Sequence, residues 1–132
     1  MRFLLDTHTF LWFVLGDARL GGSVRRLIEA PDNLCQLSTA SLWEMAIKTS
    51  LGKLEILLPI SRLVDEQVLG NGIDVLAIAP RHLDTLASLP FHHRDPFDRL
   101  LIAQSISENL PILGHDDTFD AYPIERVWPP GH

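Results

Sequence analysis

The fold is decided by Phe3-Leu4-Leu5-Asp6, a wholly apolar run that ends at an acidic residue. Three consecutive apolar residues leave no polar side, which is typical of a strand buried on both faces of a parallel sheet. The segment that follows, 8–15, is dense in large apolar residues and ends near Gly16, so it predicts a helix. A buried strand followed at once by a helix is the usual beginning of an α/β fold.

The same alternation continues along the chain. Short segments rich in apolar residues predict further strands at 34–37, 73–78, 112–113 and 124–128. Amphipathic stretches predict helices at 24–30, 40–51 and 60–69, a short helix from Pro80, and a helix from Pro96 to Asn109. Strands separated by helices, without repeats or low-complexity tracts, indicate a three-layer α/β/α sandwich around a short, mainly parallel central sheet.

Length and composition limit the possible classes of protein. A chain of 132 residues is the size of one ordinary domain, so we expect a single domain over 1–132. Apolar residues make up 46% and charged residues 21%, which is close to globular averages and excludes intrinsic disorder. The formal charge of −6 has the wrong sign for binding nucleic acid by overall electrostatics. Any nucleic-acid contact would need a local basic patch or bound cations.

Cysteine usage and the apolar runs bear on the compartment. The lone Cys35 rules out an internal disulfide and a cysteine-based zinc site, is consistent with a reducing cytosol, and is expected in the core. The longest apolar run, 10–15, is far short of the roughly 20 residues that span a bilayer. Asp6 interrupts what would be the apolar region of a signal peptide. We therefore expect a cytoplasmic protein without a membrane partner.

Four acidic residues occupy positions suited to a common site. Asp6 and Asp116 each follow an apolar strand, and ligands of parallel α/β sheets bind beyond the carboxyl ends of the strands. Glu44 lies on the narrow polar arc of a mostly apolar helix. Asp98 shares a helix face with apolar residues three and four positions later. The four carboxylates could therefore converge from distant segments.

Each acid also has a purely structural explanation. The alternatives are a helix cap for Asp6, a turn beside Asp117 for Asp116, an ion pair with Lys48 for Glu44, and first-turn capping for Asp98, to which Asp95 is better suited. Carboxylates that did converge would repel one another strongly and would require a cation. Because the candidate ligands are all oxygen atoms, Mg²⁺ or Mn²⁺ is favoured over zinc, and phosphoryl chemistry is favoured with it.

Positive charge gathers just before Asp95. His92-His93, with Arg94 and Arg99, could hold a phosphate backbone despite the negative total charge. The alternative is a solvated loop without function. The first helix is apolar around more than one face, and with Trp43 it predicts an exposed interface unless the segment around Trp128 covers it.

Four segments resemble the PIN domains of VapC-type toxins in order and spacing. They are Leu4-Leu5-Asp6-Thr7-His8 followed by Leu11-Trp12, Ser41-Leu42-Trp43-Glu44-Met45-Ala46-Ile47-Lys48, His93-Arg94-Asp95-Pro96-Phe97-Asp98-Arg99, and Leu113-Gly114-His115-Asp116 with Phe119 three positions on. Together they cover nearly the whole chain. The resemblance implies a PIN-like fold and a metal-dependent ribonuclease acting on RNA. It also implies the toxin of a toxin–antitoxin pair, with a cognate antitoxin and a homodimer as its assemblies.

The resemblance also implies roles for single residues. Asp6, Glu44, Asp98 and Asp116 match the family's catalytic acidic quartet, which would bind one or two Mg²⁺ or Mn²⁺ ions. Asp95 would either add charge beside that quartet or only cap its helix. The sequence departs from the family at Gly114, where Thr or Ser is usual, and so lacks a hydroxyl near the site.

Other functions remain open at this point. A haloacid-dehalogenase-like phosphatase also places an Asp after its first strand, but it needs a second Asp where this chain has His8. A phosphoacceptor receiver domain requires paired acidic residues early in the chain and a Lys at the end of a strand, and neither is evident. A PIN-fold module that binds RNA or protein without activity is the third alternative, supported by Gly114.

Overall fold

A five-stranded parallel sheet forms the centre of the protein in the computed structural model, which describes residues 1–130. The strands are β1 (Arg2–Leu5), β2 (Leu34–Ser38), β3 (Asp74–Leu76), β4 (Ile112–Leu113) and β5 (Arg126–Val127), in the order β3-β2-β1-β4-β5. Each neighbouring pair runs parallel. The prediction of an α/β fold with a short parallel sheet is confirmed.

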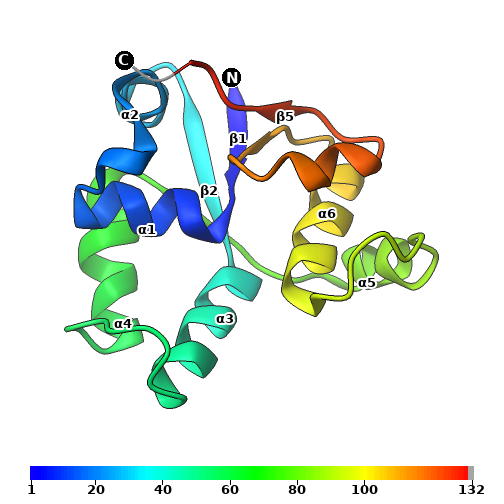
Figure 1. Ribbon diagram of the computed structural model, residues 1–132, viewed down its shortest axis with the longest axis horizontal. Coiled ribbons are helices and arrows are strands. Elements are labelled where there is room, and N and C mark those ends of the chain that lie inside the picture. Colours follow the sequence, from blue (N-terminus) through cyan, green and yellow to red (C-terminus); the bar gives the residue numbers. More distant parts are fainter. Residues whose placement is uncertain (131–132) are drawn as a thin grey trace.

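Helices cover both faces of this sheet. They are α1 (Thr7–Leu15), α2 (Gly22–Glu29), α3 (Thr39–Ser50), α4 (Ile60–Leu63), α5 (Pro80–Ala87) and α6 (Pro96–Glu108). Figure 1 shows α1, α2 and α4 on one side of the strands and α5 and α6 on the other. Short 3₁₀ turns occupy Ala18–Leu20, Leu69–Asn71 and Asp117–Ala121.

The side chains of β1 explain why its sequence is apolar throughout. Phe3 and Leu5 point into a core that includes Phe10 of α1, whereas Leu4 points into a second core that includes Leu101 of α6. Successive strand residues face opposite sides of a sheet, so a strand between two helical layers needs apolar residues at every position. Both cores are therefore anchored on β1.

Capping residues define where the two helices of interest begin. The Ser38 hydroxyl accepts a hydrogen bond from the Ala40 N–H at 3.0 Å at the start of α3. The Asp95 carboxylate accepts from the N–H groups of Phe97 at 2.8 Å and Asp98 at 3.2 Å at the start of α6. These bonds satisfy donors that the first turn of a helix leaves without partners.

Three predicted elements differ from the structure in length. The helix expected at 60–69 is α-helical only as far as Leu63, and Val64–Val68 then forms a wider, π-helical turn before the glycines at 70 and 72 end it. Glycine favours departure from an α-helix because it has a low helix propensity. Strand β3 is shorter than 73–78 because it pairs with only three positions of β2. Strand β5 is limited to two residues because β4 offers only two partners.

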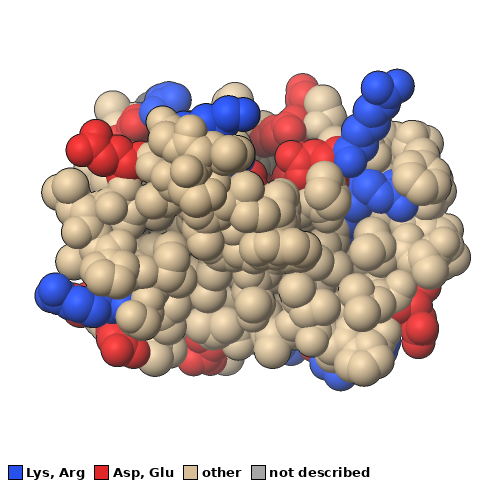
Figure 2. Space-filling view, turned by 90° about the horizontal axis from the view of Figure 1, so that it is seen from below, with Lys and Arg blue, Asp and Glu red and all other residues tan. Residues whose placement is uncertain are grey.

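The surface holds exposed apolar side chains. Trp43, Leu51 and Leu57 are 55%, 62% and 89% exposed. The face seen from below has few charged side chains near its centre, and the Lys, Arg, Asp and Glu residues gather at its borders (Figure 2). Among residues 1–130, no helix has the length and apolar character needed to cross a membrane.

Candidate active site

Two of the four candidate acids follow neighbouring strands. Leu5 of β1 pairs with Leu113 of β4, and Asp6 continues this register by donating its N–H to the Leu113 carbonyl at 3.1 Å. Asp116 follows three residues after β4. Strand β1 connects to β2 on one side and pairs with β4 on the other, so the direction of winding reverses here. Such a switch point is where parallel α/β sheets bind ligands.

The other two acids come from α3 and α6, which contact each other. Glu44 of α3 is buried, and Asp98 lies in the first turn of α6. The pKa of Asp98 is raised to about 7, first by burial and then by the negative charges of Asp95, Asp6, Glu44 and Asp116. The charges of these four carboxylates therefore disfavour the ionisation of Asp98.

Asp6 precedes α1 but does not cap it. Its side chain is buried and makes no capping hydrogen bond within the described chain. Burial raises its pKa, the nearby His8 lowers it in part, and the charge of Glu44 raises it again. The His8 imidazole lies nearby, with Nδ1 3.9 Å from Asp6 Oδ2. The capping explanation for Asp6 is therefore wrong.

Glu44 forms the ion pair that its spacing from Lys48 suggests, with 2.6 Å between Lys48 Nζ and Glu44 Oε2. The pair is only partly exposed, because the Glu44 side chain is 4% exposed and the Lys48 side chain 40%. The hydrogen bond to Glu44 raises the pKa of Lys48, and the charges of Asp95 and Asp98 add to the increase. Lys48 is thus a cation within the acidic group, a role that the sequence interpretation did not assign to it.

Asp116 acts as a turn residue, as its structural alternative proposed. Its Oδ1 accepts hydrogen bonds from the Thr118 N–H at 3.0 Å and from the Thr118 hydroxyl at 2.6 Å. Burial by itself would raise its pKa, but Thr118, His93 and Arg126 together lower the pKa of Asp116 below its ordinary value. Asp116 is therefore both a cap and an ionised group beside the other acids.

Two further residues lie at this edge: Thr118, which the sequence analysis did not single out, and His93, which it placed only in the basic stretch before Asp95. His93 Nε2 lies 2.8 Å from the Thr118 hydroxyl, which in turn contacts Asp116. The Asp-x-Thr spacing is a local turn signature that could have drawn attention to Thr118. No local pattern distinguishes His93 from its neighbour His92, because its role depends on how two distant segments meet.

Arg99 does not contribute to a phosphate-binding loop, which corrects the expectation from the sequence. Its guanidinium is largely buried and donates to the carbonyl oxygens of Pro90 at 2.8 Å and Leu89 at 3.2 Å. It also lies 4.0 Å from the centroid of the Phe91 ring. Arg99 therefore holds the loop before α6 in place, and of the two arginines only Arg94 is exposed.

Gly114 allows a close approach to Asp6. A Cβ atom at position 114 would lie 3.1 Å from Asp6 Cβ and 3.4 Å from Ile112 Cγ2. The first distance is shorter than ordinary van der Waals contact. Glycine at this position therefore leaves room for the Asp6 side chain where a larger residue would displace it.

The available ligands fit a hard divalent cation by their chemistry, since carboxylate oxygens predominate. Within residues 1–130, no three Asp, Glu, His or Cys side chains are grouped tightly enough to hold one metal ion. Coordination would therefore require the carboxylates to move closer together. The neighbouring carboxylates contribute, after burial, to the raised pKa of Asp98, and a bound cation would offset their repulsion.

Comparison with known proteins supplies the family. Residues 3–125 match the family model of the PIN domain. The chain belongs to the PIN domain family. Members of this family are generally nucleases that typically use divalent metal ions. The matched range contains every acidic residue discussed above.

A solved structure has the same fold as this PIN domain. This PIN domain is similar to the crystal structure of VapBC2 from Rickettsia felis bound to a DNA fragment from their promoter. The TM-score is 0.71 and the sequence identity 14%, over 96% of each chain. At this identity the likeness shows the fold alone. None of the curated proteins compared with this PIN domain matches it.

Proposed function

We propose that this PIN domain is a ribonuclease that hydrolyses RNA phosphodiester bonds with Mg²⁺ or Mn²⁺, and that it is the toxin of a type II toxin–antitoxin pair. The observation that carries the proposal is the gathering of Asp6, Glu44, Asp98 and Asp116 at the carboxyl end of the sheet, where burial and the neighbouring carboxylates raise the pKa of Asp98 to about 7. Crowded carboxylates repel one another when no cation is bound, and they can bind a divalent cation when one is present. Family membership then favours nuclease chemistry over the phosphatase and receiver alternatives.

Asp6, Glu44, Asp98 and Asp116 would hold the cation. When bound, a divalent cation would supply an activated water and neutralise the charge that develops on the phosphate. Lys48 orients Glu44 through their 2.6 Å ion pair. Asp95 fixes the first turn of α6 and thereby the backbone that carries Asp98. The chain thus supplies positioned carboxylates from four segments.

A cleavage assay on purified protein tests this function. We expect RNA cleavage with Mg²⁺ or Mn²⁺, none with a chelator, and none by Asp6→Asn or Asp98→Asn. Asp32→Asn is the matched control, because Asp32 is exposed and lies next to the amino-terminal end of β2, at the opposite edge of the sheet. RNA binding without cleavage would favour the inactive module instead. Release of phosphate from a small phosphomonoester would favour a phosphatase.

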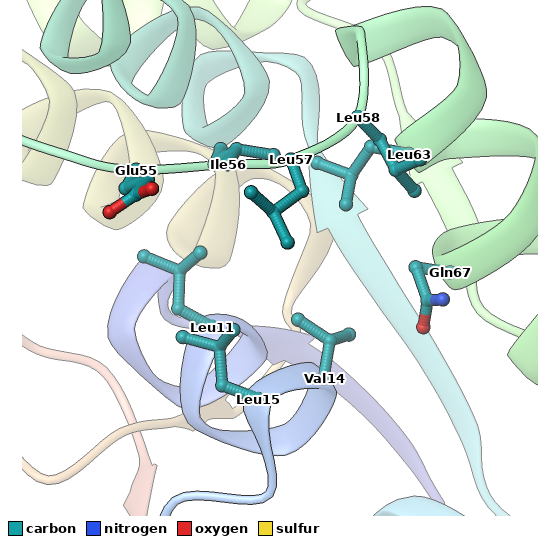
Figure 3. A pocket seen from close by; sticks show the side chains of 9 residues that line it. All are labelled: Leu11, Val14, Leu15, Glu55, Ile56, Leu57, Leu58, Leu63 and Gln67. Atoms are coloured by element: carbon teal, nitrogen blue, oxygen red, sulfur yellow. The ribbon is translucent and has the colours of Figure 1, made fainter.

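An apolar groove supports the proposed antitoxin partner. Leu11, Val14 and Leu15 of α1 face Leu57 and Leu58 across a cavity of about 350 Å³ (Figure 3). A second cavity shares Leu11 and Leu15 with it, and the walls of this second cavity include Glu44 and Lys48. A bound segment could therefore reach from the apolar groove to the acidic site.

We propose that the occupant is an apolar segment of the antitoxin with basic residues at one end. Apolar side chains fit the groove, and basic groups suit both the acidic site and the overall charge of −6. Leu57→Asp should abolish copurification with the small protein encoded beside this one and leave RNA cleavage unchanged. Leu83→Asp is the control, because Leu83 is exposed on α5, and it should change neither copurification nor RNA cleavage. Equal copurification by both variants would contradict this location.

The homodimer remains a prediction with one supporting feature. Trp43 and Leu51 of the α3 region are exposed, and Trp43 packs edge-on against Phe97 at 5.0 Å between ring centroids. A second copy of the chain would cover these side chains, because exposed apolar patches commonly mark protein interfaces. Light scattering at micromolar concentration should give twice the chain mass, and Trp43→Glu should give the single-chain mass.

A further inference from the structure

The Asp116 carboxylate lies at the end of a chain of three side chains. His93 Nε2 is 2.8 Å from Thr118 Oγ1, and Thr118 Oγ1 is 2.6 Å from Asp116 Oδ1. His93 belongs to the loop before α6, whereas Thr118 and Asp116 belong to the turn after β4. The chain therefore connects the two segments that carry Asp98 and Asp116.

The protons of this chain have one consistent arrangement. An ionised carboxylate only accepts hydrogen bonds, so the single hydroxyl proton of Thr118 is donated to Asp116. The Thr118 oxygen must then accept from His93, which assigns a proton to His93 Nε2. His93 Nδ1 is buried and has no hydrogen-bond partner among residues 1–130. The imidazole thus points Nε2 at Thr118, while Nδ1 is buried in the protein.

Packing restricts the movement of the His93 ring. The rings of Phe119 and Tyr122 lie 5.5 Å and 5.3 Å from it, between centroids. The Tyr122 hydroxyl accepts the backbone N–H groups of His92 at 3.1 Å and His93 at 3.0 Å, and donates to the Pro90 carbonyl at 3.2 Å. The loop is therefore attached to the same turn that holds Asp116.

We propose that His93, acting through the Thr118 hydroxyl, is a positioning residue that fixes the Asp116 carboxylate for cation binding, an inference that rests on the proposed function. Both hydrogen bonds from Thr118 fall on Oδ1, and in the described part of the chain Oδ2 receives none. One oxygen is thus held while the other is left for a ligand. Groups that orient a metal-binding side chain in this way typically contribute about 10-fold to 100-fold in metal affinity.

A purely structural role makes a different prediction. Capping of the Asp117–Ala121 turn needs only the bond from the Thr118 N–H to Asp116, which is independent of the hydroxyl and of His93. If capping were the whole purpose, removal of the hydroxyl would leave cation binding unchanged. The hydroxyl and the imidazole can therefore be tested apart from the cap.

Calorimetric titration of Mn²⁺ into the metal-free protein tests the proposal. Thr118→Val removes the hydroxyl with little change of shape, and His93→Phe keeps an aromatic ring without its donor. Each should weaken Mn²⁺ binding by about tenfold or more, whereas Thr118→Ser, which restores the hydroxyl, should bind as the wild type does. The double variant should lose no more than the larger single loss, because the two groups act in series.

Three results would overturn the proposal. They are wild-type affinity in both Thr118→Val and His93→Phe, losses that add in the double variant, and failure of Thr118→Ser to restore binding. Thermal melting of each metal-free variant confirms that it is folded. Mn²⁺ binding by a wild-type protein that cleaves no RNA would refute the proposed function and leave this inference standing. A wild-type protein that binds no Mn²⁺ would refute both.

Discussion

Asp98 has a raised pKa that makes stability depend on pH. In the metal-free protein its pKa rises from 3.8 to about 7, through burial and the charges of Asp95, Asp6, Glu44 and Asp116. Between these values the folded state binds a proton that the unfolded state has released. Stability therefore falls as pH rises through this window, and the full penalty is present above about pH 7.

Asp98→Asn should remove this penalty. We expect the metal-free variant to be more stable than the wild type by about 1 to 2 kcal/mol at about pH 8, after allowance for solvent screening. The gain should vanish below about pH 4, where Asp98 is protonated in both states. Urea denaturation with a chelator at several pH values measures this difference. A gain that is independent of pH would show that repulsion is not its cause.

In this chain, Gly114 leaves little room for a side chain. Its substitution by Ala would place a Cβ 3.1 Å from Asp6 Cβ. Overpacking of this kind typically costs about 1 to 3 kcal/mol, so Gly114→Ala should melt at a lower temperature and cleave RNA more slowly. Gly70→Ala is the control, because its nearest contact, the Asp65 carbonyl, would lie at 3.4 Å. Equal effects of the two substitutions would contradict the importance of the contact with Asp6.

At the scale of single residues, the sequence places the acids better than their surroundings. Asp6 and Asp116 are predictable from their position after apolar strands. The bonds of Arg99 to the Pro90 and Leu89 carbonyls are not, because they depend on how the loop before α6 folds back onto that helix. The contact of His93 with Thr118 cannot be predicted from the sequence either, because it depends on how two distant segments meet.

At the scale of elements, α3 and α6 present their acids because caps fix their first turns. Asp95 is recognisable in the sequence as a capping residue, and the structure confirms it. Ser38 caps α3 in the same way. Strand lengths are less predictable. Strand β5 is shorter than the strand predicted at 124–128, since the two residues of β4 limit its pairing. Local pattern thus predicts where elements lie, and pairing determines where they end.

Two variants of Asp95 distinguish its capping of α6 from the effect of its charge. Asp95→Asn retains an oxygen that can accept from the N–H groups of Phe97 and Asp98, and it removes a charge that raises the pKa of Asp98. Asp95→Ala removes both. We expect the Ala variant to lose about 1 kcal/mol relative to the Asn variant, measured by chemical denaturation of the metal-free proteins. Identical stabilities would mean that the cap contributes nothing.

At the scale of the whole molecule, a divalent cation should stabilise the folded chain. A ligand present at 100 times its dissociation constant adds about 2.7 kcal/mol if it binds only the folded state. Mn²⁺ should therefore raise the melting temperature, and more at about pH 8 than at about pH 6, because protons compete for Asp98. A sodium salt of equal ionic strength is the control. Equal shifts from both salts would indicate general screening instead of a site.

The order of the strands brings the acids together although they are far apart in the sequence. A PIN domain and a solved structure that share only 14% identity retain the same fold, with a TM-score of 0.71. The sheet order β3-β2-β1-β4-β5 sets Asp6 and Asp116 at one edge, and α3 and α6 add Glu44 and Asp98 there. The parallel α/β fold could be inferred from the alternation of strands and helices, whereas the strand order and the distances between carboxylates could not.

The central claim is that these carboxylates form a cation-dependent nuclease centre. Its most direct test is the rate of RNA cleavage as a function of Mn²⁺ concentration, for the wild type and for Asp98→Asn prepared identically. The account predicts that the wild-type rate rises with Mn²⁺ to a plateau, falls to background with a chelator, and stays at background in Asp98→Asn at every concentration. Cleavage that persists in the chelator, or an Asp98→Asn variant that reaches the wild-type plateau, would contradict it.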